Sequence, residues 1–365
     1  MLPANRLLIY TLVYIYANSS QKTMPPHTTS LIMQAIIHAK GHSMRPTIVV
    51  TQPVPGDAVA RLRQIGDVTY RTTDGPLPAV ELRQLLAPAD AVLCLLTDRI
   101  DDALLATTPR LKIVANMAAG YNNIDVAAAS TRQIAVTNTP GVLSESTADL
   151  TFALILGVMR RLSESEAFLR SGQWAYWSAT LLLGSEVHSR TIGIVGMGRI
   201  GTAVARRARA FNMRVVYTAR SVHAEAEALG AERVDLDALL AQSDIVSLHV
   251  PYNAATHHLI NAQRLSQMQP SAFLINTARG SVVDEAALAD ALHRGIIAGA
   301  GIDVFEAEPT IHPQLLSAPN TLLLPHIGSA TLQTRSAMAR MAADNILAFF
   351  VGNRPPQLVN PEYLA

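Results

Sequence analysis

A glycine-rich turn between a strand-like and a helix-like segment constrains this chain more than any other feature. Residues 191–195 (TIGIV) are typical of a buried strand, residues 196–201 read GMGRIG, and residues 202–208 continue at helical spacing. In the pattern G-x-G-x-x-G, Gly196 permits the tight turn, Gly198 lets the backbone approach a pyrophosphate, and Gly201 lets helix and strand pack closely. The helix N-terminus then offers N–H groups to phosphate. The pattern predicts a dinucleotide site; a glycine turn that only packs is the alternative.

The residues after the next strand-like segment bear on which dinucleotide binds. An acidic residue about 20 positions beyond the glycines would bind the ribose 2′-hydroxyl of NAD. Residues 213–217 (MRVVY) are followed instead by Thr218, Ala219, Arg220 and Ser221. A carboxylate would repel a 2′-phosphate, whereas Arg220 with neighbouring hydroxyls such as Ser221 could bind one. We expect NADP(H) to be favoured over NAD(H), unless Arg220 is only a solvated surface residue.

Elsewhere the chain alternates short apolar runs with helical patterns, which indicates parallel α/β structure. Strands are expected at residues 47–51, 91–95, 111–116 and 135–138, and then at 191–195, 213–217, 244–248, 273–276, 298–303 and 321–324. The later six match a doubly wound nucleotide-binding sheet. Long helices are expected near 146–162 and 332–350. Because the first half lacks its own closing helix, we expect the chain to return to the first domain at its end.

Composition excludes several classes of protein. Hydrophobic residues make up 49% and charged residues 16%, so the chain can bury a core and is not broadly disordered. Lys and Arg number 29 against 28 Asp and Glu, with no basic block, which argues against a nucleic-acid partner. The one cysteine, Cys94, excludes a disulfide framework within the chain and fits a reducing compartment.

The N-terminal residues need a separate interpretation. Residues 7–16 (LLIYTLVYIY) are apolar but shorter than the roughly 20 residues that span a bilayer. Residues 17–19 could pass for a weak signal-cleavage site. We favour two other interpretations, in which residues 1–43 are a poorly ordered extension or are translated upstream of a true start at Met44. We therefore expect a cytoplasmic protein with no membrane partner.

Three further segments place polar residues where expected strands end. They are residues 273–280 (FLINTARG), 301–309 (GIDVFEAEP) and 324–328 (LPHIG). Ligands of open α/β sheets bind beyond the carboxyl ends of the strands. Together these segments offer four candidate residues, Arg279, Asp303, Glu308 and His326. Each has an ordinary structural explanation alone, but together, beside a dinucleotide fold, they indicate a catalytic set.

Hydride transfer to a carbonyl is the chemistry that these side chains suit. It needs a proton donor for the developing alkoxide, and histidine has an ordinary pKa near neutrality. His326 is the candidate donor, and Glu308 could orient it and favour its protonated form. Arg279 can bind a substrate carboxylate bidentately and polarise its carbonyl. No metal site is expected, because no metal-ligand spacing is present.

Five motifs, in this order, resemble those of the D-isomer-specific 2-hydroxyacid dehydrogenases. They are residues 119–125 (AGYNNID), 193–201 (GIVGMGRIG), 276–280 (NTARG), 303–309 (DVFEAEP) and 325–328 (PHIG). The resemblance covers about residues 46–360. It implies that Arg279, Glu308 and His326 are the family's catalytic residues and that Asp303 lies near the nicotinamide carboxamide.

The same resemblance implies further contacts. Cofactor-contacting positions within or beside the motifs are Arg199, Ile200, Thr277, Ala278 and Gly328, and Pro251, at the end of an expected strand, is added as a weaker candidate. The loop at Ala119 and Gly120 looks like the one whose backbone amides hold the substrate carboxylate, together with Arg279 and His326. Glycine-rich backbone can present N–H groups to an anion in this way.

The domain organisation implied is a Rossmann nucleotide-binding domain at 144–330 and a flavodoxin-like substrate domain at 44–143 and 331–365. Within the family the chain most resembles the glyoxylate/hydroxypyruvate and 2-ketogluconate reductases, from residues 95–98 (LLTD), 174–177 (WAYW) and 217–220 (YTAR). We therefore expect NADPH-dependent reduction of small 2-keto acids to D-2-hydroxy acids.

The resemblance also implies a homodimer joined through the nucleotide-binding domain, with residues 170–190 as an arm. Trp177 on this arm could cover the partner's cleft and narrow substrate choice, or could lie in the dimer core. Other functions on the same scaffold remain open. One is an NAD(H)-sensing corepressor-like protein, and the others are an NAD-linked D-2-hydroxyacid dehydrogenase of different substrate and formate or phosphite oxidation. Arg220 argues against the NAD-linked reactions.

Overall fold

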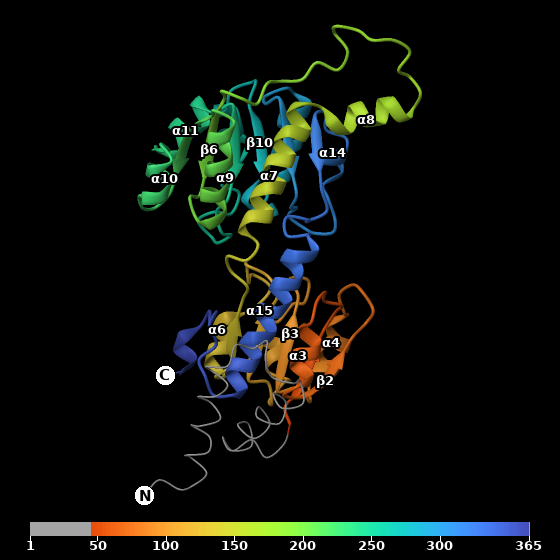
Figure 1. Cartoon of the computed structure of the whole chain (residues 1–365), viewed down its shortest axis with the longest axis vertical. Helices are drawn as coiled ribbons and strands as arrows, with labels where there is room; N and C mark the ends of the chain where they lie inside the picture. Colours follow the sequence, from red (N-terminus) through yellow and green to blue (C-terminus); the bar gives the residue numbers. More distant parts are fainter. Residues whose placement is uncertain (1–44, 365) are drawn as a thin grey trace, which may run out of the picture. The chain divides into compact units, whose positions relative to one another are not determined.

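The chain passes between two α/β units at two places, after Val142 and after Ala330 (Figure 1). The computed structural model describes residues 45–364. Unit 1 comprises the described residues through Val142 and those from Thr331 onward, and unit 2 comprises Leu143–Ala330. The interpretations of residues 1–43 and of a start at Met44 lie outside the described residues. No helix in the described part of the chain is long and apolar enough to span a membrane.

Unit 1 is built on five parallel strands in the order β2-β1-β3-β4-β5, which is the flavodoxin-like order. The strands are β1 (Thr47–Val50), β2 (Asp67–Tyr70), β3 (Ala91–Cys94), β4 (Ile113–Asn116) and β5 (Ala135–Thr137). Strand β2 was not predicted from the sequence. This strand lies at the sheet edge and alternates exposed and half-buried residues, so it lacks the continuous apolar run that marks the central strands.

Helices cover both faces of this sheet. They are α3 (Ala58–Arg63), α4 (Ala79–Leu86), α5 (Asp102–Leu105), α6 (Val126–Thr131) and α15 (Leu332–Phe350), with a short 3-10 turn η2 (Pro361–Leu364). Residues of α4, α5 and α6 join one core with alternate residues of the strands, including Val49, Val92 and Val114. Helix α15 packs on α3, where Arg61 Nε donates to Asp344 at 3.0 Å.

Unit 2 has seven parallel strands in the order β12-β11-β10-β9-β6-β7-β8. They are β6 (Thr191–Val195), β7 (Arg214–Thr218), β8 (Glu232–Arg233), β9 (Ile245–Leu248), β10 (Phe273–Asn276), β11 (Gly299–Ile302) and β12 (Thr321–Leu323). The sheet is the doubly wound Rossmann type that the sequence predicted, so the fold class is confirmed. Within unit 2, strand β8 was not predicted, because its two exposed charged residues carry no apolar signal.

Alternate strand residues of unit 2 face two separate cores. Ile192 and Ile194 pack with α7 (Ser144–Met159) and α9 (Arg199–Ala210), whereas Val195 packs toward the opposite face. The remaining elements are α10 (Ala224–Ala228), α11 (Leu236–Gln242), α12 (Ala262–Gln267), η1 (Gly280–Val282), α13 (Glu285–His293) and α14 (Pro313–Leu316). Burial on both faces explains the predominantly apolar runs of central strands such as β9 and β10.

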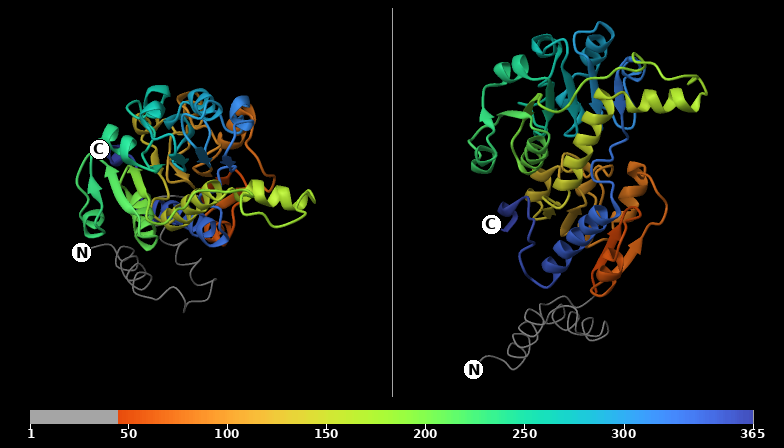
Figure 2. Two further views of the ribbon diagram at one scale, coloured as in Figure 1. Left: turned by 90° about the horizontal axis from the view of Figure 1, so that it is seen from above. Right: turned by 45° about the horizontal axis from the view of Figure 1, so that its top comes forward.

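The helix expected at residues 146–162 is α7, which ends earlier than expected. Helix α7 ends at Met159, and α8 (Leu162–Arg170) begins after Arg161, whose φ of +53° is left-handed and breaks the helical path. Beyond α8, residues 171–190 form a long loop that extends with α8 away from the sheet of unit 2 (Figure 2). The poor periodicity of this segment agrees with its irregular backbone.

Candidate active site

Three loops that follow neighbouring strands carry the residues predicted to be catalytic. Because β10, β11 and β12 are parallel neighbours, their carboxyl ends lie at one edge of the sheet. Arg279 follows β10, Glu308 lies in the loop after β11, and His326 follows β12. The topology thus gathers at one edge three side chains that are far apart in sequence.

Glu308 and His326 form a direct pair. Nδ1 of His326 lies 2.8 Å from Oε2 of Glu308, and their side chains are 28% and 29% exposed. The second carboxylate oxygen, Oε1, accepts the N–H of Phe305 at 3.0 Å. Glu308 is therefore held at both oxygens, and Nε2 is the ring nitrogen of His326 that this pair leaves for a ligand.

The backbone at His326 is strained. Its φ is +53°, in the left-handed region that non-glycine residues rarely adopt. The His326 N–H donates to the Asp303 carbonyl at 2.9 Å. The Asp303 carboxylate accepts the N–H groups of Ile327 at 2.7 Å and Gly328 at 2.8 Å. These hydrogen bonds of Asp303 hold the turn that carries the imidazole of His326. Backbone strain of this kind is commonly found at functional sites.

Burial and neighbouring groups have opposing effects on the pKa values of the titratable residues in this site. Burial alone would raise the pKa of Glu308, but the hydrogen bond and charge of His326, with the Phe305 N–H and Arg279, hold that pKa below its ordinary value. Burial raises the pKa of Asp303, although the N–H of Ile327 opposes the rise. Burial lowers the pKa of Arg279, and the charge of Glu308 opposes that change. Arg279 still keeps its proton near neutral pH.

Hydrogen bonds shape the turn that carries Arg279. The Asn276 side chain donates to the Arg279 carbonyl at 3.0 Å and accepts the Ala278 N–H at 3.0 Å. Nη1 of Arg279 donates to the Ala278 carbonyl at 2.6 Å. Thr277, also on this turn, is buried with its hydroxyl 3.1 Å from that of Thr151 on α7, a contact that the sequence did not signal.

The glycine turn after β6 fits a dinucleotide. A Cβ at Gly201 would lie 2.2 Å from the Gly196 carbonyl oxygen, so packing alone requires glycine there. A Cβ at Gly198 would meet nothing within 4 Å, and the φ of Gly198 is −81°. Neither packing nor backbone conformation demands glycine at 198. The open space above it suits the close approach of a pyrophosphate to the backbone at the start of α9.

Two arginines from different segments lie near the end of β7: Arg220 follows the strand, and Arg233 is on the neighbouring strand β8. Residues 218–221 hold no carboxylate, and Arg220 and Ser221 are exposed. Arg233 on β8 pairs in register with Tyr217 and donates to the carbonyl of Ala219 at 3.0 Å. Arg233 was not predicted from the sequence, because the two-residue strand that places it beside β7 has no sequence signal.

The other predicted contacts lie as follows. Arg199 and Ile200 begin α9, Ala278 precedes Arg279, and Pro251 is exposed beyond β9. Ala119 and Gly120 belong to unit 1, where their carbonyls accept from Asn138 at 2.6 Å and from Asn116 at 3.0 Å. Their role toward a substrate stays a prediction.

Known proteins match this chain over most of its length. Residues 152–328 match the family described as D-isomer specific 2-hydroxyacid dehydrogenase, NAD binding domain. A glyoxylate reductase of Thermococcus litoralis is 45% identical over 326 residues, which cover 88% of this chain and 98% of the relative. The chain belongs to the D-isomer specific 2-hydroxyacid dehydrogenase family.

Solved structures agree with this membership. A protein of Thermus thermophilus is similar with a TM-score of 0.81 and 44% identity, covering 86% of this chain and 99% of that one. An NADPH-dependent glyoxylate/hydroxypyruvate reductase of Sinorhizobium meliloti, in complex with NADP and malonate, is similar with a TM-score of 0.78 and 37% identity, covering 87% and 98%. This member of the 2-hydroxyacid dehydrogenase family is therefore an oxidoreductase that acts on CH–OH groups with a nicotinamide cofactor.

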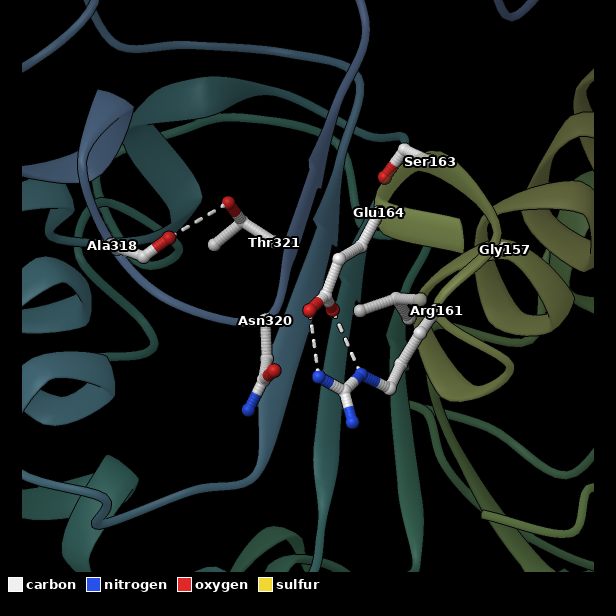
Figure 3. A pocket seen from close by; sticks show the side chains of 8 residues that line it. Gly157, Arg161, Ser163, Glu164, Ala318, Asn320 and Thr321 are labelled. Atoms are coloured by element: carbon white, nitrogen blue, oxygen red, sulfur yellow. Dashed lines mark hydrogen bonds and ion pairs between the residues drawn. The ribbon is translucent and has the colours of Figure 1, made fainter. Parts of the chain in front are cut away.

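Unit 2 also contains a cavity that is separate from the candidate active site. It has a volume of about 190 Å³ and is lined by residues of α7, α8 and the start of β12, including Gly157, Arg161, Glu164 and Asn320 (Figure 3). Arg161 and Glu164 form an ion pair there. Because Asn320 precedes β12 whereas His326 follows it, the cavity lies at the opposite edge of the sheet. No cluster of potential metal ligands exists among residues 45–364.

Proposed function

We propose that this enzyme reduces small 2-keto acids to D-2-hydroxy acids with NADPH. Glyoxylate and hydroxypyruvate are the first candidate substrates, and 2-ketogluconate is a larger one. The observation that carries the choice of cofactor is the end of β7, where no carboxylate stands and where Arg220 and Arg233 supply positive charge. A 2′-phosphate is bound well by guanidinium groups and repelled by carboxylates.

The proposed roles follow from the geometry at the carboxyl edge of unit 2. Arg279 binds the substrate carboxylate and polarises its carbonyl. A bound nicotinamide supplies the hydride that reaches the carbonyl carbon. Nε2 of His326 gives its proton to the carbonyl oxygen as negative charge develops there, which completes the CH–OH group. Glu308, 2.8 Å from Nδ1, orients the imidazole and stabilises its charged form.

Further proposed roles concern binding of the two ligands. Gly196, Gly198 and Gly201 with the start of α9 hold the pyrophosphate. The rest of the cofactor contacts Arg199 and Ile200 at the start of α9. It also contacts residues in the loops that follow strands, namely Ser221, Pro251, Thr277, Ala278, Asp303 and Gly328. The backbone at Ala119 and Gly120 adds N–H donors for the substrate carboxylate.

The experiment that tests this function measures oxidation of NADPH and NADH by the purified full chain with each keto acid in turn. Rapid turnover with NADPH and little with NADH would support both the reaction and the role of Arg220. Equal rates with NADH would contradict the choice of cofactor only. Tight cofactor binding without turnover of any keto acid would contradict the reaction and favour a nucleotide-sensing role.

We also propose that two copies associate through α8 and the arm of residues 171–190. Apolar side chains on this segment are unusually exposed, with Tyr176 at 76% and Trp177 at 79%. Clustered exposed aromatic residues are typical of interfaces. Sedimentation of the wild type and a Tyr176→Glu/Trp177→Glu variant tests this, with Val80→Glu as an exposed control in unit 1. An unchanged sedimentation coefficient in the arm variant would contradict the proposal.

A separate experiment tests whether Trp177 shapes the substrate site. It measures how well Trp177→Ala discriminates between glyoxylate and larger keto acids.

A further inference from the structure

Glu285, the first residue of α13, is a buried carboxylate outside the predicted catalytic set. It is 7% exposed, and no cationic side chain pairs with it among the described residues. One carboxylate oxygen accepts the N–H of Glu306, and the other accepts the N–H of His312 at 3.1 Å. Burying a charge is costly unless hydrogen bonds compensate it. Glu285 therefore uses its charge to hold the backbone of the loop that follows β11.

Glu306 returns the same contact. Its Oε1 accepts the N–H of Glu285 at 2.9 Å, so each glutamate binds the backbone amide of the other. Its Oε2 lies 3.1 Å from Nε2 of His258. We call the two reciprocal hydrogen bonds the Glu285–Glu306 clamp. The clamp joins the start of α13 to the loop after β11.

The turn that follows Arg279 packs directly against the same loop. A Cβ at Gly280 would lie 1.8 Å from the carbonyl carbon of Phe305, so no side chain fits between the two backbones. From this contact the chain runs through η1 to Glu285. The loop after β11 therefore contacts the segment that follows Arg279 at two places, through close packing at Gly280 and through hydrogen bonds at Glu285.

The clamp lies directly beside the backbone N–H group that binds Glu308. The N–H of Phe305 donates to Glu308 at 3.0 Å, and the next N–H along the chain, that of Glu306, donates to Glu285. These consecutive amides are bound by two different carboxylates. A shift of the Glu306 amide would therefore carry the Phe305 amide with it and change how Glu308 faces His326.

We propose that Glu285 and Glu306 are positioning residues, which through the clamp hold the Arg279 turn and the Glu308 loop in register and so orient the Glu308 carboxylate toward His326. This inference rests on the proposed function. Residues that orient catalytic groups, without touching the substrate, commonly change activity by about 10- to 100-fold when they are removed.

The test compares Glu285→Ala, Glu285→Gln and Glu306→Ala with the wild type. Glu285→Ala is expected to lower kcat by about 10- to 100-fold while the Kd for NADPH and the KM for the keto acid change by less than about threefold. Glu285→Gln keeps one acceptor oxygen and should restore part of kcat. Glu306→Ala, at a more exposed position, should lower kcat without preventing folding. Asp235→Ala, at the N-cap of α11, is the matched control, since Asp235 also accepts a backbone N–H but lies outside this loop.

Two further readouts separate positioning from general stability. In a double-mutant cycle, Glu285→Ala should lower kcat little further in a Glu308→Gln background, because the clamp acts through Glu308. Amide hydrogen exchange at residues 303–309 should accelerate in Glu285→Ala and stay unchanged in Asp235→Ala. Parallel losses of kcat, NADPH affinity and Tm, or an additive cycle, would overturn the proposal.

The exchange measurement also separates this inference from the proposed function. A wild-type enzyme that reduces no keto acid would contradict the proposed function. Unchanged exchange at residues 303–309 in both Glu285→Ala and Glu306→Ala would overturn the clamp, whether or not the wild type is active.

Discussion

The guanidinium of Arg233 donates two hydrogen bonds, at 3.1 Å and 3.0 Å, to the carbonyl oxygen of Ala219. Arg233 lies on β8, whereas Ala219 directly precedes Arg220 at the end of β7. The edge strand thus delivers a second positive charge to the place where the dinucleotide motif predicts the ribose of the cofactor. The preference for NADPH that we propose would then depend on residues from two strands.

Replacing these arginines should change cofactor choice. Arg220→Ala is expected to raise the Kd for NADPH by about tenfold or more while leaving the Kd for NADH unchanged, because only NADPH carries the 2′-phosphate. Arg233→Ala should act in the same direction by a smaller factor. Nucleotide fluorescence titration measures both constants. Arg214→Ala is the control, since Arg214 pairs with Glu232 at the start of β7. Equal weakening of NADPH and NADH would contradict the role of Arg220.

Two glycines of the turn after β6 should respond oppositely to alanine. A methyl group at Gly198 meets no protein atom within 4 Å, so Gly198→Ala should keep the Tm but weaken NADPH binding by about tenfold or more. Gly201→Ala places a methyl 2.2 Å from the Gly196 carbonyl oxygen and should destabilise unit 2 by about 1–3 kcal/mol. Thermal unfolding and NADPH titration check the pair. A lowered Tm with intact binding in Gly198→Ala would refute the pyrophosphate assignment.

Loss of the imidazole at residue 326 should abolish most of the reaction. His326→Ala is expected to lower kcat for keto-acid reduction by about 10²- to 10⁴-fold, which is the usual contribution of a general acid. The Kd for NADPH should change little, because the proposed donor contacts the substrate. His293→Ala, at an exposed histidine of α13, is the control. Cofactor binding lost together with activity would count against the assigned role.

His249 should make unit 2 sensitive to acid. Burial lowers the pKa of His249 to about 3, and among the described residues its Nδ1 atom has no partner. The unfolded chain takes up a proton below about pH 6.5, but the folded chain does so only near pH 3, so stability falls as the pH drops through this window. The slope is at most about 1.4 kcal/mol per pH unit.

Replacing His249 removes this titration. His249→Gln should lose less stability than the wild type between about pH 6.5 and pH 5, as measured by denaturant unfolding at several pH values. His293→Gln, which replaces an exposed histidine of α13, is measured in parallel. Identical slopes in His249→Gln and the wild type would show that His249 does not stay neutral in the folded protein.

Much of the fold was predictable where strands are buried on both faces. Strands such as β6 and β10 have no polar face, so their apolar runs are uninterrupted in the sequence. The glycine turn then predicted a helix directly after β6. The edge strands β2 and β8 were missed because exposed residues interrupt their pattern. The end of α7 was predicted at residue 162 rather than Met159, because the left-handed residue Arg161 carries no strong sequence signal.

The sequence by itself determined which chemical groups this enzyme has: the glycine turn, the absence of a carboxylate after β7, and the arginine, glutamate and histidine after three strands. Motif order is enough for that because those residues follow strands whose ends meet at one edge of a parallel sheet. Only the tertiary structure decided which groups touch. The bonds of Arg233 to Ala219 and of Glu285 to Glu306 join segments far apart in the chain, and such contacts depend on strand order and backbone position, which local periodicity does not encode.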